Sequence, residues 1–508
     1  MKAIVYLIAP ESLLRLFQRI EASPLGTRLA KGAFWSLSGS LISRGLGLIS
    51  AILVGRMLGR DSFGELGIIQ NTIGMFGVLA GLGMGLTANK HIAELKLSDP
   101  ERAGRILGLA SSTAWLTSGV MAGVLALCAP WIAEETLNAP HLAGLLQIGA
   151  ILLFLSGING AQTGALSGFE SFKAIAHINL ISGILTFPLM VGGAWWWGVT
   201  GAVWGLIGSQ LVNCLLCFLA VRSEAARFQI SYVFAGWGGE WQLFWRFSLP
   251  AVLTGLLNSV VAWGASALVV NQVGGYGEMG IYNAALRVKL LPETFLAMLI
   301  APMLPILSEA FGKGDNLTFQ RTLLFNFFLA TLIIVPVSLV QAAAPALTLM
   351  PFGAGYQGHP AIVQWLMLHA VAYALLFPMG SILISMGRMW LSWWVNLLLA
   401  VTFAVASCLM VPRFGAVGYA ASLAIAYILA NIPCVIFLYR QIPDVMNHLK
   451  WIVIAVTTGV LFGGCVAISG RSTLALCSAF GFFAATVFLI CKVMLYRGAL
   501  KSSVTSEP

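Results

Sequence analysis

Long apolar segments recur along the whole chain, and they constrain its fold more than any other feature. Fourteen of them have about 20 residues, the length that a helix needs to cross the hydrocarbon core of a bilayer. The pattern therefore predicts an all-α polytopic membrane protein with fourteen transmembrane helices. The segments cover residues 33–55, 64–87, 106–130, 142–166, 174–197, 199–221, 247–271, 279–307, 322–345, 361–385, 389–411, 415–438, 451–469 and 473–494.

The composition agrees with this prediction and argues against bound metals and cofactors. Hydrophobic residues make up 59% of the chain and charged residues 9%, against about 25% charged residues in soluble domains. The eight cysteines lie almost entirely in apolar segments, without His or Asp at metal-binding spacing, which predicts packing roles. The chain also has no Gly-x-x-x-x-Gly-Lys-Ser/Thr loop for ATP. We therefore expect no metal and no cofactor.

Lysines and arginines are unevenly divided between the two predicted sets of connections. Of the 28 such residues, three lie deep inside apolar segments, and 21, including Lys492 near the end of the last segment, belong to the set that includes both termini. The other set holds the remaining four, Arg56, Arg60, Arg413 and Arg471. Because cytoplasmic connections are enriched in Lys and Arg, both termini are predicted to be cytoplasmic. The net charge of +10 is then an orientation signal, so we expect no nucleic-acid partner.

Two short motifs recur in the second half of the chain. Phe63–Ile68 resembles Tyr276–Ile281 at an offset of 213 (277 minus 64), and Gly198–Gly201 resembles Gly415–Gly418 at an offset of 217 (415 minus 198). Each pair lies at the start of a predicted helix. The motifs therefore predict two six-helix lobes with the same orientation, as in transporters built from parallel repeats.

The repeats divide the chain into five predicted parts. Residues 1–32 form a cytoplasmic flank, and residues 33–222 form the N-lobe. Residues 223–246 are rich in aromatic and charged side chains, which predicts an amphipathic linker on the inner membrane surface. The C-lobe follows over residues 247–439. Residues 440–508 contain the last two helices and a cytoplasmic tail.

The first hundred residues resemble one family of membrane transporters. The stretch Ala33–Gly67, with Gly81–Gly83 and Lys90–Glu94, is similar to the N-terminal signature of the Wzx-type polysaccharide flippases of the multidrug, oligosaccharidyl-lipid and polysaccharide (MOP) superfamily. The resemblance implies a multi-pass protein of the bacterial inner membrane. It also implies that an undecaprenyl-diphosphate-linked oligosaccharide, such as an O-antigen, capsule or exopolysaccharide repeat unit, moves to the outer leaflet through a cavity between the lobes. Membrane lipids, a polysaccharide polymerase and export machinery are the further partners it implies.

Ionisable side chains inside the apolar segments are costly and therefore mark functional candidates. Arg44 lies eleven residues into the first segment, about 17 Å along a helix, and that segment contains no acidic residue. Arg287, Lys289 and Glu293 lie in the eighth segment. A planar guanidinium offers paired donors to phosphate oxygens. We therefore expect Arg44, Arg287 and Lys289 to bind an anionic substrate in a cationic central cavity.

The eighth segment supports two interpretations. Lys289 and Glu293 are four residues apart and share a helix face, whereas Arg287 shares its face with Asn283 and lies about 200° from Lys289. Lys289 and Glu293 either form an ion pair that fixes helix packing, or Glu293 couples transport to a proton or sodium gradient.

Neutral amides occur in corresponding segments of both predicted lobes. Gln70, Asn71, Asn258 and Asn283 could each contact the sugar or form an interhelical hydrogen bond. The sequence leaves both roles open for these four residues, and we include them among the candidate substrate-binding residues.

Two other functions are weaker alternatives. A membrane polysaccharide polymerase or ligase would be expected to carry catalytic acids or bases on a large outer loop. The longest predicted outer loop, residues 341–360, carries His359 and no Asp, Glu, Lys or Arg. A cation-coupled drug exporter of the same superfamily would favour carboxylates inside the membrane, but the charges placed deep in the apolar segments are three cations and one carboxylate. The sequence therefore predicts a transporter with no catalytic residue.

The predicted topology can be tested with reporters. A reporter fused after Pro508 should be active in the cytoplasm, and one inserted near Gly355 should be active outside, because the 21 to 4 division of basic residues sets the orientation. Paired alkaline phosphatase and fluorescent protein fusions measure this. Reporters found on the same side would contradict the topology.

Overall fold

The computed structural model describes residues 24–231, 249–300, 303–386 and 388–441, in which every regular element is a helix. The short ones are η1 (Ile132–Thr136), η2 (Pro140–Leu142), α13 (Pro345–Leu349), η5 (Met350–Phe352) and η6 (Ala354–Tyr356). The longer ones are α3 (Pro24–Gly81), α4 (Met84–Leu95), α5 (Pro100–Trp131), α6 (Ala143–Gly168), α7 (Phe172–Arg227), α9 (Leu249–Val270), α10 (Gly275–Ile300), α11 (Met303–Gly312), α12 (Asn316–Ala343), α14 (Pro360–Ser385) and α15 (Met389–Gln441).

Within the described ranges, eight helices are long and apolar enough to cross a membrane, which confirms an all-helical, multi-pass membrane protein. Helix α10 has a comparable length but carries four charged side chains and is not among the eight. The predicted helices 451–469 and 473–494 lie outside the described residues. So do the C-terminal tail, residues 1–23 and most of the linker. The count of fourteen helices therefore stays a prediction.

Three of the eight helices each contain two predicted transmembrane segments. A non-helical residue interrupts α3 at Gly59, α7 at Trp197 and Gly198, and α15 at Gly415. Gly198 has φ 58° and ψ −136°, and Gly415 has φ 55° and ψ −133°. Side chains other than hydrogen are essentially excluded from this conformation. The breaks lie at the boundaries that the sequence predicts between neighbouring segments.

The second repeated motif has the same structure in both copies. A Cβ atom on Gly201 would lie 1.9 Å from the carbonyl oxygen of Gly193. In the other copy, a Cβ atom on Gly418 would lie 2.4 Å from the carbonyl oxygen of Met410, again eight residues earlier. Both segments, in α7 and α15, therefore fold back into a tight helical hairpin that only glycine permits. The equal geometry supports an internal repeat.

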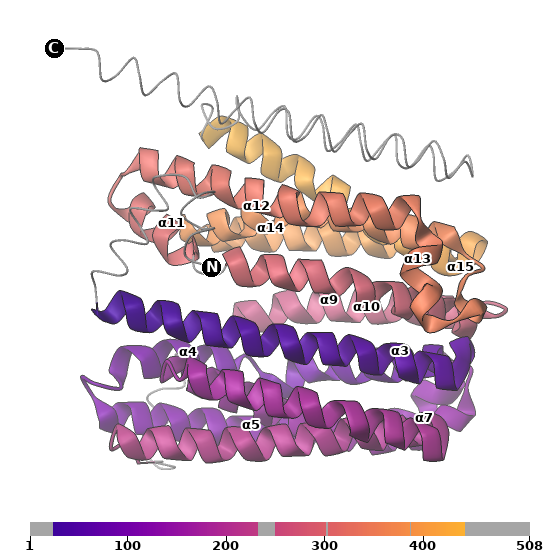
Figure 1. Ribbon diagram of the computed structural model, residues 1–508, viewed down its shortest axis with the longest axis horizontal. Coiled ribbons are helices and arrows are strands. Elements are labelled where there is room, and N and C mark those ends of the chain that lie inside the picture. The colour runs from indigo at the N-terminus through magenta and orange to yellow at the C-terminus, as the bar shows by residue number, and fades with distance from the viewer. Residues whose placement is uncertain (1–23, 232–248, 301–302, 387, 442–508) are drawn as a thin grey trace.

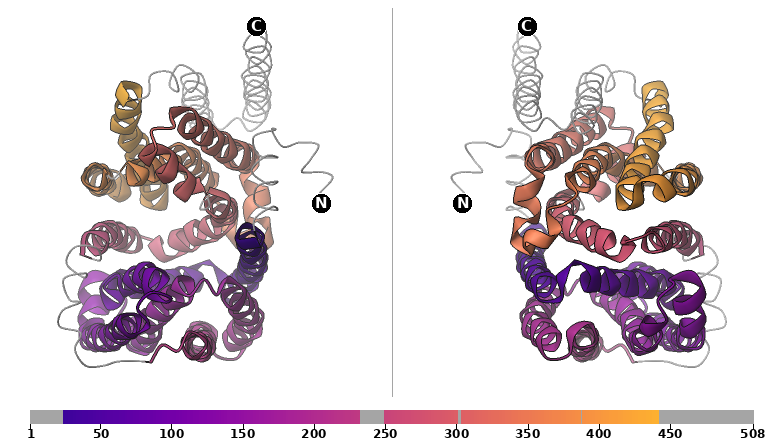
Figure 2. Two further views of the ribbon diagram at one scale, coloured as in Figure 1. Left: turned by 90° about the vertical axis from the view of Figure 1, so that its left-hand side faces the viewer. Right: turned by 90° about the vertical axis from the view of Figure 1, so that its right-hand side faces the viewer.

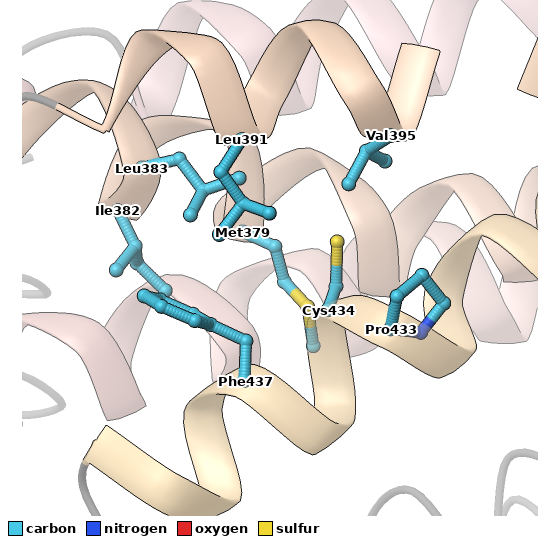
Figure 3. A pocket seen from close by; sticks show the side chains of 8 residues that line it. All are labelled: Met379, Ile382, Leu383, Leu391, Val395, Pro433, Cys434 and Phe437. Atoms are coloured by element: carbon cyan, nitrogen blue, oxygen red, sulfur yellow. The ribbon is translucent and has the colours of Figure 1, made fainter. Parts of the chain in front are cut away.

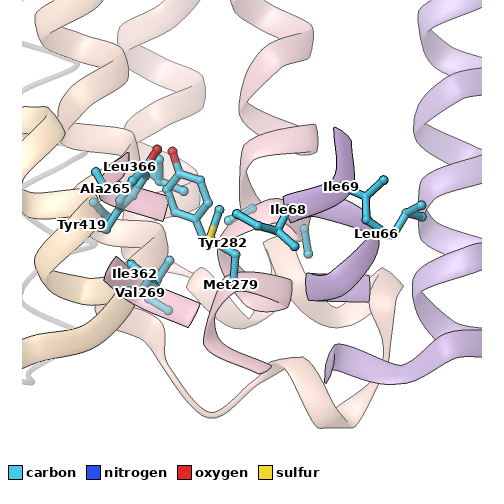
Figure 4. Close-up of a cluster of buried hydrophobic side chains, with 14 of the residues drawn as sticks. Leu66, Ile68, Ile69, Ala265, Val269, Met279, Tyr282, Ile362, Leu366 and Tyr419 are labelled. Carbon is cyan, nitrogen blue, oxygen red and sulfur yellow. The ribbon is translucent and has the colours of Figure 1, made fainter. Parts of the chain in front are cut away.

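The helices form two bundles that lie side by side (Figures 1 and 2). We call α3–α7 the N-bundle and α9–α15 the C-bundle. The second arm of α3, residues 60–81, packs against α9 and α10, and the two copies of the first repeated motif meet there. A Cβ atom on Gly64 would lie 1.9 Å from the carbonyl oxygen of Tyr276, and one on Gly280 would lie 1.9 Å from that of Arg60. The buried apolar core continues through this contact from α3 to α15 (Figure 4).

The bundles are also joined at the end of the molecule where α13 lies, on the right in Figure 1, which we call the α13 end. The Tyr276 hydroxyl donates to the carbonyl oxygen of Leu137 at 2.9 Å. The Tyr356 hydroxyl donates to the carbonyl oxygen of Gly55 at 2.8 Å. Burial, together with the charge of Asp61, raises the pKa of Tyr356, so its hydroxyl stays protonated and remains a donor. This end is therefore closed by contacts between the bundles.

The hairpin contact in α7 predicts opposite outcomes for two adjacent glycines. A Cβ atom on Gly193 would lie 2.2 Å from the carbonyl oxygen of Gly201, whereas one on Gly192 would meet nothing within 4 Å. Gly193→Ala should destabilise the protein by about 1–3 kcal/mol, because backbone atoms must move apart. Gly192→Ala should be neutral or slightly stabilising, because alanine favours helix. Detergent melting curves and membrane abundance measure both, and equal effects would contradict the hairpin.

Candidate functional site: a polar seam between the bundles

Three consecutive side chains of α3 bind C-bundle groups in the middle of the molecule. Successive residues of a helix point about 100° apart, so these bonds show that α3 is held between α9 and α10. We call this set of interactions the seam. An Arg287 Nη2–H donates to Gln70 Oε1, Asn71 Nδ2–H donates to Ser266 Oγ at 3.4 Å, and Trp263 Nε1–H donates to Thr72 Oγ1 at 2.9 Å.

The four predicted amides are engaged in different ways. Gln70 and Asn71 belong to the seam, and Asn258 Nδ2 donates to Asn396 Oδ1 of α15 at 3.2 Å. Asn283 is buried, and its Nδ2 has no hydrogen-bond partner among the described residues. The Asn283 amide packs on Gly67, where a Cβ atom would lie 1.7 Å from Nδ2. In this conformation, three of the four amides therefore form interhelical hydrogen bonds.

Arg287 is the charged member of the seam. Among the described residues it makes one hydrogen bond, to the neutral amide of Gln70, and no carboxylate lies within ion-pair distance. Gly74 lies one turn beyond Gln70 on the same face of α3 and is exposed. A Cβ atom on Gly74 would meet nothing within 4 Å, so open space adjoins the seam here. The Arg287 guanidinium therefore keeps its charge unneutralised beside this space.

Lys289 and Glu293 lie in a different environment from Arg287. Their Nζ and Oε1 atoms are 2.9 Å apart, and the side chains are only 3% and 8% exposed. His369 of α14 lies within electrostatic range of Lys289, and its ring meets that of Tyr427 at 4.3 Å between centroids. The predicted ion pair therefore forms inside the C-bundle, on the face of α10 away from the seam.

Arg44 lies apart from these groups on the first arm of α3. Its side chain is exposed, and among the described residues it has no ion pair. The preceding residue, Ser43, packs on Gly183 of α7, where a Cβ atom would lie 2.7 Å from Ser43 Oγ and Cα. No contact between described residues joins Arg44 to Arg287 or Lys289. The structure thus distributes the three predicted cations over three environments.

A pocket between α14 and the two arms of α15 has an apolar lining (Figure 3). It is small, with a volume of about 10 Å³. Its lining offers no charged group, so it does not suit a diphosphate or a sugar. The lining residues are Met379, Ile382, Leu383, Leu391, Val395, Pro433, Cys434 and Phe437.

Sequence reasoning did not identify four polar residues that complete these interactions. Thr72, Trp263 and Ser266 belong to the seam, and Ser266 Oγ also donates to the Tyr419 hydroxyl at 3.4 Å. The one sequence feature that points to them is the spacing of polar residues along a helix. Trp263 and Ser266 are three residues apart and so share a face of α9, but the sequence does not show which helix that face meets.

Comparison with known proteins identifies the family. A model of the polysaccharide biosynthesis protein family matches residues 29–311. The chain belongs to this family. This polysaccharide biosynthesis protein is 25% identical over 295 residues to the lipid III flippase of Escherichia coli (strain K12), covering 56% of this chain and 69% of the relative. It is 23% identical over 408 residues to the lipopolysaccharide biosynthesis protein WzxC of the same organism, covering 78% and 77%.

Solved structures show the fold of this family member. A multidrug resistance MATE family transporter of the MOP superfamily, in an inward-facing conformation, superposes with a TM-score of 0.62 at 16% identity, covering 82% of this chain and 99% of the other. An outward-facing structure of such a transporter gives 0.58, also at 16% identity, covering 82% and 96%. The resemblance to the Wzx-type polysaccharide flippases, predicted from the first hundred residues, is confirmed.

The buried pair in α10 predicts a large loss of stability when one partner is removed. Glu293→Gln leaves Lys289 buried without its anion, which should cost about 3–5 kcal/mol. Replacing both residues, as Lys289→Met with Glu293→Gln, should recover much of the loss. Detergent melting curves measure each variant.

The matched control is Glu309→Gln. Glu309 forms the same type of pair with Lys313 but in an exposed position, and exposed pairs contribute little. A Glu293→Gln melting curve as close to the parent as that of Glu309→Gln would contradict the structural importance of the buried pair.

Proposed function

We propose that this protein flips an undecaprenyl-diphosphate-linked oligosaccharide from the inner to the outer leaflet of the bacterial inner membrane. Transport proceeds by alternating access between the two bundles, and the protein is not an enzyme. Membership of the polysaccharide biosynthesis family supports this, as do relatives named as a lipid III flippase and a lipopolysaccharide biosynthesis protein.

The observation that carries the proposal is Arg287. A guanidinium inside the membrane is expensive, and in the part of the chain that the structure describes this one bonds only to a neutral amide, at the interface between two bundles of a transporter fold. A diphosphate supplies the paired anionic acceptors that such a group lacks. Arg44, exposed on the first arm of α3, is the second cation that we propose for substrate binding. Gln70, Asn71, Asn258 and Asn283 are the proposed neutral contacts once the seam opens.

Lys289 and Glu293 have a separate proposed role. The pair lies inside the C-bundle beside His369, away from the seam. We propose that Glu293 couples transport to an ion gradient, while Lys289 neutralises its charge in the resting state. Substrate binding and coupling would then use opposite faces of α10.

The two alternatives fit the described residues less well. A cation-coupled drug exporter shares the fold, but the only ionised side chain in the seam is a guanidinium, which repels a cationic drug. A polymerase or ligase needs catalytic acids or bases, and the loop 344–359 carries only His359 as a titratable group besides the buried Tyr356.

The remaining parts of the proposal come from the sequence. They are two parallel six-helix lobes over 33–222 and 247–439, a cytoplasmic linker over 223–246, two further helices, and both termini in the cytoplasm. A polysaccharide polymerase and export machinery would receive the flipped repeat unit on the outer side.

Accumulation of lipid-linked repeat units in a deletion strain tests the function. Complementation with Arg287→Ala should fail, because losing charge-assisted hydrogen bonds worth about 1.5–3 kcal/mol lowers substrate binding roughly 10- to 100-fold. Arg287→Lys should restore part of the export, because the charge remains and the bidentate geometry is lost. Arg44→Ala tests the second cation in the same way.

Arg413→Ala is the control, because Arg413 is exposed beside the Gly415 break in the middle of α15 and lies outside the proposed site. Export by Arg287→Ala at the level of Arg413→Ala, with equal protein abundance, would contradict the proposal.

A further inference from the structure

The Gln70–Arg287 bond of the seam belongs to a continuous line of contacts between α3 and α10 that reaches the α13 end. Its members on α3 are spaced three or four residues apart, which keeps them on one helix face. We call it the α3–α10 contact line. From the α13 end inward it joins Arg60 to Gly280, Gly64 to Tyr276, Gly67 to Asn283, and Gln70 to Arg287.

Within this line, Gln70 and Arg287 are joined by a hydrogen bond, whereas the other contacts are close van der Waals contacts at glycines. The Asn283 Nδ2 atom, one step along, is buried and makes no hydrogen bond among the described residues. Breaking the Gln70–Arg287 bond therefore removes the hydrogen bond at the inner end of the line, beside the open space at Gly74.

Gln70 is a weak partner for Arg287. A guanidinium has five N–H donors, and a neutral amide oxygen accepts from one of them here. In the bond to Gln70 only the donor is ionised, whereas a diphosphate is itself anionic and can accept two N–H donors of the guanidinium in parallel. An anionic ligand that enters the space beside Gly74 therefore competes successfully for Arg287.

We propose that Gln70 occupies the place of the ligand in the closed state, and that a diphosphate opens the α13 end by displacing it from Arg287. The inference rests on the proposed function. The ligand binds the state in which Gln70 has left Arg287 better than the closed state, in which the two are bonded. This difference in affinity shifts the equilibrium between the two states. Loss of the Gln70–Arg287 bond weakens the α3–α10 contact line, which includes the contact of Gly64 with Tyr276. The Tyr276 hydroxyl joins the bundles at Leu137, so this bond is weakened as well.

A distance measurement across the α13 end tests the proposal. Spin labels at Glu135→Cys and Val273→Cys, in full-length protein without its native cysteines, report the separation of the bundles, because both positions are exposed and adjoin the bond from Asn271 to Thr136. The probe is farnesyl diphosphate, with farnesol as the same chain without the anion. In nanodiscs, farnesyl diphosphate should shift the population to a longer distance, and farnesol should not.

Two substitutions of Gln70 should act in opposite directions. Gln70→Glu places a carboxylate opposite Arg287, which competes better with the diphosphate. The concentration of farnesyl diphosphate that gives half of the distance shift should therefore rise at least about tenfold. Gln70→Leu removes the competitor, so the longer distance should appear without ligand. Gln147→Glu, the same chemical change at an exposed site on α6, should behave as the parent protein.

Three outcomes would overturn the proposal. The first is a Gln70→Glu variant that responds at the parental concentration, and the second is a Gln70→Leu variant that stays closed without ligand. Because Gln70→Leu is judged separately, poor folding of Gln70→Glu does not prevent the test. The third is stabilisation of the parent by farnesyl diphosphate in melting curves without any change of distance. That result leaves diphosphate binding, and so the proposed function, intact, whereas absence of stabilisation contradicts both.

Discussion

The close packing of α3 against α10 is the contact on which the arrangement of the two bundles depends. In a membrane, helices gain little from burying apolar side chains away from lipid, so association relies on close van der Waals contact and interhelical hydrogen bonds. Gly64 and Gly280 let these two backbones approach to distances that exclude a Cβ atom, and Gly67 leaves room for the Asn283 amide. The seam adds the hydrogen bonds. Together they bring one helix of the N-bundle between two helices of the C-bundle.

This contact also gives the charges of α10 different surroundings. Arg287 faces α3 and a neutral partner, whereas Lys289 and Glu293 face the interior of the C-bundle and each other. The paired charges neutralise one another within the bundle, so burial is tolerable. No carboxylate of the described ranges neutralises Arg287, and an intramembrane cation without a counter-ion is the feature expected of a site for an anionic ligand. The same helix thus presents a buried ion pair on one face and, on the other, the cation that we propose binds the substrate.

The internal repeat accounts for the glycine contacts at the α13 end. The hairpins of α7 and α15 have nearly the same glycine dihedral angles and the same close contact eight residues back along the chain. The two copies of the other motif, around Gly64 and Gly277, meet each other at the α3–α10 contact. A motif that packs on its own copy places equivalent helices at the interface of the bundles. Small changes there act on both bundles at once.

The sequence by itself determined the membrane class, most helix boundaries, the repeat and the family. These follow from local properties: a bilayer requires about 20 apolar residues per helix, and only glycine adopts the dihedral angles at Gly198 and Gly415. It also identified Arg287, Lys289 and Glu293, and the helical angle placed Arg287 away from the pair. Only the tertiary structure decided which partner each side chain meets. Gln70 meets Arg287 and Asn71 meets Ser266 because two distant helices cross there, and Arg44 meets neither. Such pairings depend on the rotation and depth of each helix against another, and the periodicity of one helix carries no information about either.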